Sequence, residues 1–110
     1  MDRIAKLKEF LASNPTDSFV QHALALEYVK TGDDAEARKL FENILSSDEN
    51  YIGSYYHLGK LLERNDETET AIQWYEKGML KAKEKGDMHA YNELQSAWED
   101  LGPLSPGGGT

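Results

Sequence analysis

Two runs of sequence decide the fold: YIGSYYHLGKLLER at residues 51–64 and, after a polar turn, AIQWYEKG at residues 71–78. Their apolar residues recur at helical spacing, which predicts two helices folded back on each other. Small residues, Gly59 and Ala71, stand where the helices would touch, and the bulky Tyr75 stands one turn beyond Ala71. A small residue facing a large one lets two helix backbones approach closely while neighbouring side chains fill the space. We therefore expect a tightly packed helical hairpin here.

The rest of the chain has the same kind of spacing. Apolar residues every three or four positions predict further helices on both sides of the hairpin, and no segment alternates with the period of two that a half-buried strand needs. Short connections make successive helices antiparallel neighbours. The predicted fold class is therefore all-α, with about six helices. The expected helices span about residues 2–13, 17–30, 34–46, 52–64, 68–83 and 88–100.

Polar residues between these segments predict how the helices begin and end. Thr16 or Asp17 can cap the second helix, and Asp33 has capping-box spacing to the glutamate three residues later. Gly32 is expected to stop the second helix in the left-handed conformation. Asn65 is expected to take the same conformation in the hairpin turn, because asparagine tolerates it better than most residues.

The hairpin has an earlier copy in the chain. When the sequence is shifted by 34 residues against itself, residues of similar size meet on the inner faces of two helix pairs. The shared pattern is a large residue with a small one beside it, then a small residue and an aromatic one in the next helix. The matching pairs are Leu24 with Leu58, Ala25 with Gly59, Ala37 with Ala71, and Phe41 with Tyr75.

This pattern resembles the tetratricopeptide repeat, a helix–turn–helix unit of 34 residues with an aromatic opening, a Leu-Gly pair, a later Ala and aromatic residue, and a closing Pro. Gln21 departs from the aromatic opening, and Glu49 and Lys83 stand where the proline is expected. Pro15 is in register for a preceding half unit. The motif positions are filled by Leu24, Ala25, Tyr28, Ala37 and Phe41 in the first unit, and by Tyr55, Leu58, Gly59, Leu62, Ala71 and Tyr75 in the second.

The resemblance implies a right-handed superhelical stack of antiparallel helix pairs. It divides the chain into a half repeat at 2–15, repeats at 18–51 and 52–85, a capping helix at 87–101 and a flexible tail at 102–110. In this family the first helix of each pair lines a concave wall. We therefore expect a non-catalytic protein–protein interaction module that binds a peptide or a segment of a partner protein in this groove. The alternative is a self-associating structural domain, in which an exposed end or the groove binds another copy; we expect a monomer or a weak homodimer.

The residues expected on the concave wall line up as stripes, because positions three, four and seven apart share one helix face. This wall would be apolar and aromatic with a slight positive excess, which suits a peptide with apolar anchors and some acidic residues. The expected groove residues are Phe19, His22, Leu26, Val29 and Lys30 on the first stripe, Tyr56, Lys60 and Arg64 on the second together with Gly53 and Glu63, and Tyr91 on the capping helix.

Charge and composition exclude several other functions. The net charge of −8 opposes binding to nucleic acid and to anionic membranes. No stretch approaches the roughly 20 apolar residues of a membrane span. The absence of cysteine and of an apolar leader favours a cytoplasmic location. His22 and His57 could approach each other on adjacent helices, but a zinc site needs further ligands. We therefore expect no metal, no cofactor and no catalytic residue.

Two further features concern the surface and the end of the predicted stack. Lys77, Lys81 and Lys85 form a basic row at helical spacing, which predicts a solvated outer face; the alternative is an electrostatic contact. Trp98 is expected to be buried as a contact of the capping helix rather than to line the groove.

Overall fold

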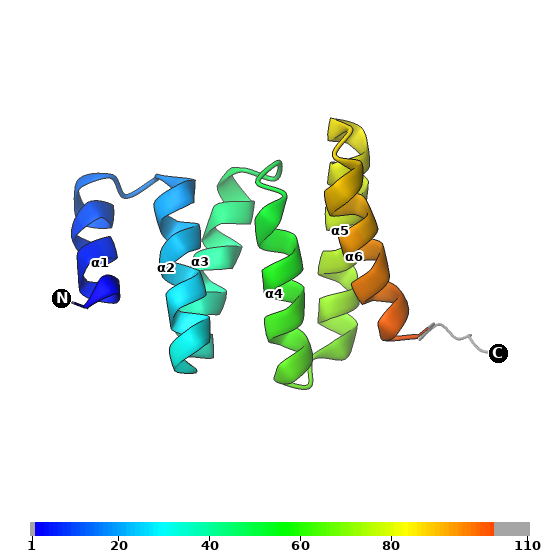
Figure 1. Cartoon of the computed structure of the whole chain (residues 1–110), viewed down its shortest axis with the longest axis horizontal. Helices are drawn as coiled ribbons and strands as arrows, with labels where there is room; N and C mark the ends of the chain where they lie inside the picture. The colour runs from blue at the N-terminus through cyan, green and yellow to red at the C-terminus, as the bar shows by residue number, and fades with distance from the viewer. Residues whose placement is uncertain (1, 103–110) are drawn as a thin grey trace.

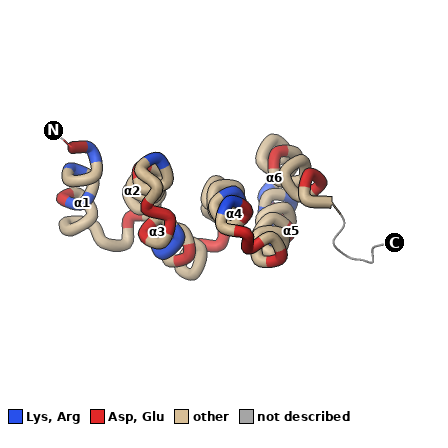
Figure 2. Tube along the Cα trace, turned by 90° about the horizontal axis from the view of Figure 1, so that it is seen from below, with Lys and Arg blue, Asp and Glu red and all other residues tan. Residues whose placement is uncertain are grey.

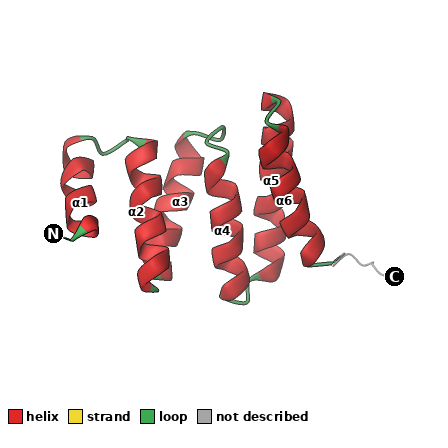
Figure 3. Cartoon of the chain, viewed as in Figure 1, coloured by secondary structure: helices red, strands yellow, loops and turns green. Residues whose placement is uncertain are grey.

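The computed structural model describes residues 2–102, and these form α-helices without a strand (Figure 1, Figure 3). This confirms the all-α prediction. The expected tail lies, from residue 103 onward, outside the described residues. The helices are α1 (Arg3–Ser13), α2 (Ser18–Thr31), α3 (Asp34–Ser47), α4 (Gly53–Arg64), α5 (Thr68–Lys85) and α6 (Met88–Asp100).

The helices form an elongated stack, and the two ends of the described chain lie at opposite ends of its long axis (Figure 1). The molecule measures 51 × 30 × 20 Å. Viewed along the helices, α2 and α6 lie in one row with α4, and α3 and α5 lie in a second row (Figure 2). Each helix packs against the next one in sequence, and α4 also contacts α2 and α6. The stack thus places α2 and α4 side by side on one face.

The hairpin of α4 and α5 packs through the small residues that the sequence pointed to. A Cβ atom added to Gly59 would lie 2.1 Å from Cε1 of Tyr75, whose side chain is fully buried. Gly78 has the same relationship to Tyr55, with 2.6 Å to the tyrosine Cβ. These distances are far below van der Waals contact, so only glycine lets the two helices approach this closely. The predicted contact at Gly59 and the burial of Ala71 are confirmed.

The helix starts agree with the sequence in one case and differ in another. Asp17 caps α2, because its Oδ1 accepts the backbone N–H of Val20 at 3.1 Å. The capping box expected at Asp33 is absent from α3. The carboxylate of Asp33 instead turns back and accepts the hydroxyl of Thr31 at 2.8 Å. The hydroxyl competes successfully for this acceptor, so the capping-box prediction was wrong.

The helix ends differ from expectation at one turn. Gly32 adopts φ of 83° and ends α2 as predicted. After α4, however, Asp66 is left-handed with φ of 63°, and Asn65 has φ of −102°. The amide of Asn65 donates to the carboxylate of Asp34 at 2.8 Å and to the carbonyl of Leu61 at 2.9 Å. These two bonds hold Asn65 at the end of the helix, and the reversal falls one residue later.

The basic row on α5 is engaged rather than only solvated. Lys77 and Lys81 lie 3.0 and 3.3 Å from the carboxylate of Glu49, and Lys85 donates to the carbonyl of Asn50 at 3.4 Å. The row therefore tethers α5 to the loop between α3 and α4, which agrees with the alternative of an electrostatic contact. Its partners were not predicted, because that loop is distant along the chain.

The capping helix α6 covers the far end of the core. Leu94 and Ala97 are buried, and Trp98 is half-buried with its indole N–H donating to Glu76 at 3.0 Å. Trp98 thus contacts α5, but it is only half-buried and not buried as expected. Within residues 2–102, no helix has both the length and the apolar character needed to cross a membrane.

Candidate partner-binding groove

A groove of about 390 Å³ lies between α2 and α4, near the C-terminal ends of both helices. Its floor is apolar at neutral pH, because it is made by two aliphatic side chains and an uncharged imidazole. Its rim carries charged side chains from the last two turns of α4. The lining residues are Val29, His57 and Leu61 on the floor and Lys60, Glu63 and Arg64 on the rim.

A compact polar contact sets the spacing of α2 and α4 beside this groove. Nδ1 of His22 lies 2.9 Å from the hydroxyl of Ser54, and Ser54 is fully buried. Gly53 lies next to this imidazole, and a Cβ there would make an ordinary contact of 3.8 Å with Cε1 of His22. The ring of His22 also meets Phe41 and His57 with centroid distances of 5.6 and 5.5 Å. The two histidines therefore serve as packing groups between helices.

Burial keeps both histidines uncharged near neutral pH. Burial, together with a smaller like-charge repulsion from the nearby His57, lowers the pKa of His22 to about 4. Burial also lowers the pKa of His57, and the carboxylate of Glu93 on α6 opposes this shift. A protonated imidazole here would lose hydration without gaining a close anion. The floor of the groove near His57 is consequently neutral.

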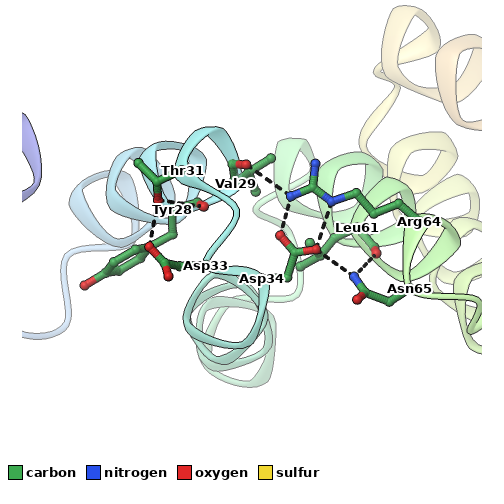
Figure 4. A network of polar contacts seen from close by, with 8 residues as sticks. All are labelled: Tyr28, Val29, Thr31, Asp33, Asp34, Leu61, Arg64 and Asn65. Atoms are coloured by element: carbon green, nitrogen blue, oxygen red, sulfur yellow. Dashed lines mark hydrogen bonds and ion pairs between the residues drawn. The ribbon is translucent and has the colours of Figure 1, made fainter.

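Arg64 closes the lower end of the groove and joins the two repeats (Figure 4). Its Nε donates to Asp34 at 2.8 Å, a second guanidinium nitrogen contacts the same carboxylate, and that nitrogen also donates to the carbonyl of Val29 at 3.1 Å. The guanidinium holds the pKa of Asp34 below its usual value. Arg64 is thus committed to internal contacts, and the expected positive excess of the wall is reduced.

Lys60 is the rim cation that faces outward beside an aromatic ring. Its Nζ lies 3.6 Å from the carboxylate of Glu63 and 6.0 Å from the ring centroid of Tyr56. Glu63 also accepts the hydroxyl of Tyr75, so its charge is shared between two partners. The side chain of Lys60 is 45% exposed. Because its ion pair with Glu63 is weak, Lys60 can exchange it for a carboxylate of a bound molecule.

The residues predicted for the groove fall into separate parts of the structure. Val29, Lys60 and Arg64 line it. Phe19 is 71% exposed at the opposite end of α2, and Lys30 is exposed and paired with Glu27 at 3.3 Å. The others are half-buried and are not among the lining residues, although Tyr56 lies next to Lys60: His22 and Leu26 on α2, Tyr56 on α4, and Tyr91 on α6.

The sequence analysis missed His57 and Leu61 as lining residues. Both belong to the side of α4 that turns toward α2, next to the expected stripe rather than on it. Helical periodicity identifies faces, but how far α4 is rotated against α2 depends on the packing of Ser54 and His22. Glu63, which shares the expected stripe, does line the groove.

A metal site at the pair of His22 and His57 would need further ligands close by. Among residues 2–102, no group of three or more His, Cys, Asp or Glu side chains is placed to hold a metal ion together. The imidazoles of His22 and His57 instead meet edge to face.

The stacked hairpins define an α-helical repeat protein. Residues 20–51 and 52–79 each match the tetratricopeptide repeat family model. The chain belongs to the tetratricopeptide repeat family, whose repeats generally mediate protein–protein interactions and are generally non-catalytic.

Solved structures agree with this assignment. A crystallised tetratricopeptide repeat domain protein from Salinibacter ruber is 42% identical, covers 81% of this chain and 99% of its own, and has a TM-score of 0.76. An NMR structure of such a domain from the same organism is 42% identical, covers 83% and 92% of the two chains, and has a TM-score of 0.77. A protein from Bordetella parapertussis shares the fold at 24% identity, with 92% and 88% coverage and a TM-score of 0.80. No curated protein matches the chain significantly.

Proposed function

We propose that this domain is a non-catalytic protein–protein interaction module that holds a peptide or a segment of a partner protein across α2 and α4. The observation that supports this function is the groove between these helices, with its apolar floor and charged rim. In this proposal the repeats at 18–51 and 52–85 each contribute their first helix to the binding face, and the helix at 87–101 closes the stack.

The shape of the face limits the guest. The groove, at about 390 Å³, is near the lower end of the range of ligand pockets, which begins at about 300 Å³. It can therefore take one large apolar side chain of a peptide. Phe19 stands ten residues before Val29, so the two anchor points are about 15 Å apart along α2. An extended peptide covers that distance with about four or five residues. A short linear segment with two apolar anchors fits this face.

The charge of the rim favours a particular kind of residue next to the anchoring side chain of the bound peptide. Lys60 is exposed, whereas Arg64 is held by Asp34 and by the carbonyl of Val29. A carboxylate next to the anchoring side chain would meet Lys60 beside Tyr56. The proposed guest therefore carries an acidic residue close to an aliphatic or aromatic one.

A displayed library of random 12-residue peptides tests the proposal. We expect selection on the immobilised domain to enrich sequences that combine an apolar and an acidic residue, and the combined Tyr56→Ser and Lys60→Glu variant to lose at least tenfold in affinity for them. Lys83→Glu makes the same charge change on the exposed surface of α5 and is the control. If the selected peptides bind the groove variant and the parent equally, the groove is not the binding site.

A further inference from the structure

The two helices at the ends of the described stack, α1 and α6, differ from the inner helices in how they are paired. The loop from α1 to α2 is held by the same kind of hydrogen bond as the loop from α3 to α4. In each, a side chain of the following helix donates to a main-chain carbonyl six residues upstream: Gln21 to Pro15, and Tyr55 to Glu49. Accordingly, α1 has the position of the second helix of a pair, and by the same order α6 has the position of a first helix. Within residues 2–102 neither helix has its pair partner. Among the described helices, α1 packs on α2 alone.

The outer face of α1 is partly apolar and hollowed. One side of α1 packs on the core through Ile4, Leu7 and Leu11. On the other side, Phe10 is 55% exposed. It borders a hollow of about 270 Å³ whose other lining residues are Lys6, Glu9 and Ser13.

The two ends of the stack also differ in charge. In α1 there are three basic residues, Arg3, Lys6 and Lys8, against the single acidic Glu9. In α6 there are three exposed acidic residues, Glu93, Glu99 and Asp100, and neither Lys nor Arg. Figure 2 shows basic positions on α1 and acidic ones on α6, at opposite ends of a chain whose net charge is −8. Arg3 is paired with Glu27 at 2.9 Å, and Nζ of Lys8 lies 5.9 Å from the ring centroid of Tyr28. Lys6 is therefore the basic side chain of α1 that can meet the acidic side chains of α6.

We propose that copies of this chain associate head to tail, with α6 of one copy packing antiparallel beside α1 of the next, so that the two helices form a pair. The directions are suitable, because α6 runs opposite to α1 within the stack, as α4 runs opposite to α5 (Figure 1). Lys6 faces the acidic side chains of α6, and Phe10 is covered by it. Such a contact is heterologous and leaves one free end at each side, so assembly continues with concentration instead of stopping at a dimer.

Sedimentation velocity and light scattering of the full chain across a concentration series measure this association. We expect the average mass to rise with concentration at low salt and to fall again in 0.5 M salt, because salt screens the attraction between exposed charges. A mass that stays at one chain at every concentration overturns the proposal.

Point variants distinguish the proposed contact from non-specific association through exposed apolar side chains. Phe10→Ser should weaken association by about tenfold or more, because it removes the apolar centre of the contact. Leu80→Ser is the control, since Leu80 is equally exposed, at 55%, but lies on α5. An equal effect of both substitutions overturns the proposal, provided that circular dichroism shows both variants folded.

Charge reversal with mixing identifies the two faces. Lys6→Glu changes only α1, and the double variant Glu93→Lys and Glu99→Lys changes only α6. Each variant alone should lose association by about tenfold or more, because like charges then meet. An equimolar mixture should associate, since one variant keeps the acidic α6 and the other keeps the basic α1. If the α6 variant alone still associates as the parent does, or the mixture stays monomeric, the contact is not between α1 and α6.

Discussion

Gln21 and Tyr55 occupy equivalent positions in successive repeats, and each donates a side-chain hydrogen bond to the main-chain carbonyl six residues upstream. The distances are 3.0 Å from Gln21 to Pro15 and 2.7 Å from Tyr55 to Glu49. Both side chains are buried. Gln21 also accepts from Asn43 on α3 at 2.8 Å. The residue that departs from the repeat motif in sequence therefore preserves the contact that ties each loop to the next helix.

Removing this hydrogen bond should lower stability. Tyr55→Phe deletes only the hydroxyl and leaves the carbonyl of Glu49 with one partner fewer, which typically costs about 1 kcal/mol. Urea unfolding measures the change. Tyr91→Phe, at a half-buried position of α6, is the control and should shift the free energy of unfolding by less than about 0.5 kcal/mol. Equal values for the two variants would show that the hydroxyl of Tyr55 contributes nothing.

Adding one methyl group at Gly59 should destabilise the hairpin. The new Cβ would lie 2.1 Å from the ring of Tyr75, which is fully buried and has no room to move. Overpacking of this kind costs about 1–3 kcal/mol. It outweighs the gain of about 1 kcal/mol that alanine brings inside a helix.

Gly53→Ala is the matched control for Gly59→Ala. Its Cβ would make an ordinary contact of 3.8 Å with His22, so the variant should be as stable as the parent or slightly more stable. Thermal denaturation of both variants tests the difference. A Gly59→Ala variant that melts at or above the parent would refute the close approach of α4 and α5.

Stability should fall as the solution is acidified from pH 6.5 toward pH 4. His22 has a folded-state pKa of about 4 against an ordinary value of 6.5, so in this range the unfolded chain binds more protons than the folded one. Its contribution is complete above pH 6.5 and is lost progressively toward pH 4. His57 acts in the same direction, because burial lowers its pKa too.

Replacing the histidine identifies the source of this pH dependence. His22→Gln keeps a polar partner for Ser54 but cannot take up a proton, so its free energy of unfolding should change less steeply between pH 7 and pH 5. Unfolding in urea at several pH values provides the measurement. Parallel curves for the parent and the variant would mean that His22 does not titrate on unfolding.

The ion pair of Arg64 with Asp34 should couple the two repeats weakly. The side chains are 47% and 22% exposed, so water and salt screen the attraction. We expect a coupling of about 0.2–1 kcal/mol from a double-mutant cycle with Asp34→Asn and Arg64→Gln, and a smaller one in high salt. Strict additivity of the two substitutions would show that the pair of Asp34 and Arg64 in Figure 4 contributes no coupling to stability.

Local sequence determined the helices and the contacts inside each hairpin. The spacing of apolar residues decides which face of a helix is buried, and the small size of Gly59 and Ala71 decides where two helices touch. Both features depend on residues that are close together in the sequence. The predicted cap of α3 was wrong, because the carboxylate of Asp33 accepts the hydroxyl of Thr31 and makes no cap hydrogen bond.

The tertiary structure alone decided which part of the predicted face forms the groove. Val29 and Lys60 came from the expected stripes, but His57 and Leu61 did not, and Phe19 lies apart from them. Arg64 is occupied by Asp34, thirty residues earlier in the chain. The physical reason is that a helical period specifies a face, whereas the rotation of one helix against another and the partners of a long charged side chain depend on residues that meet only after folding.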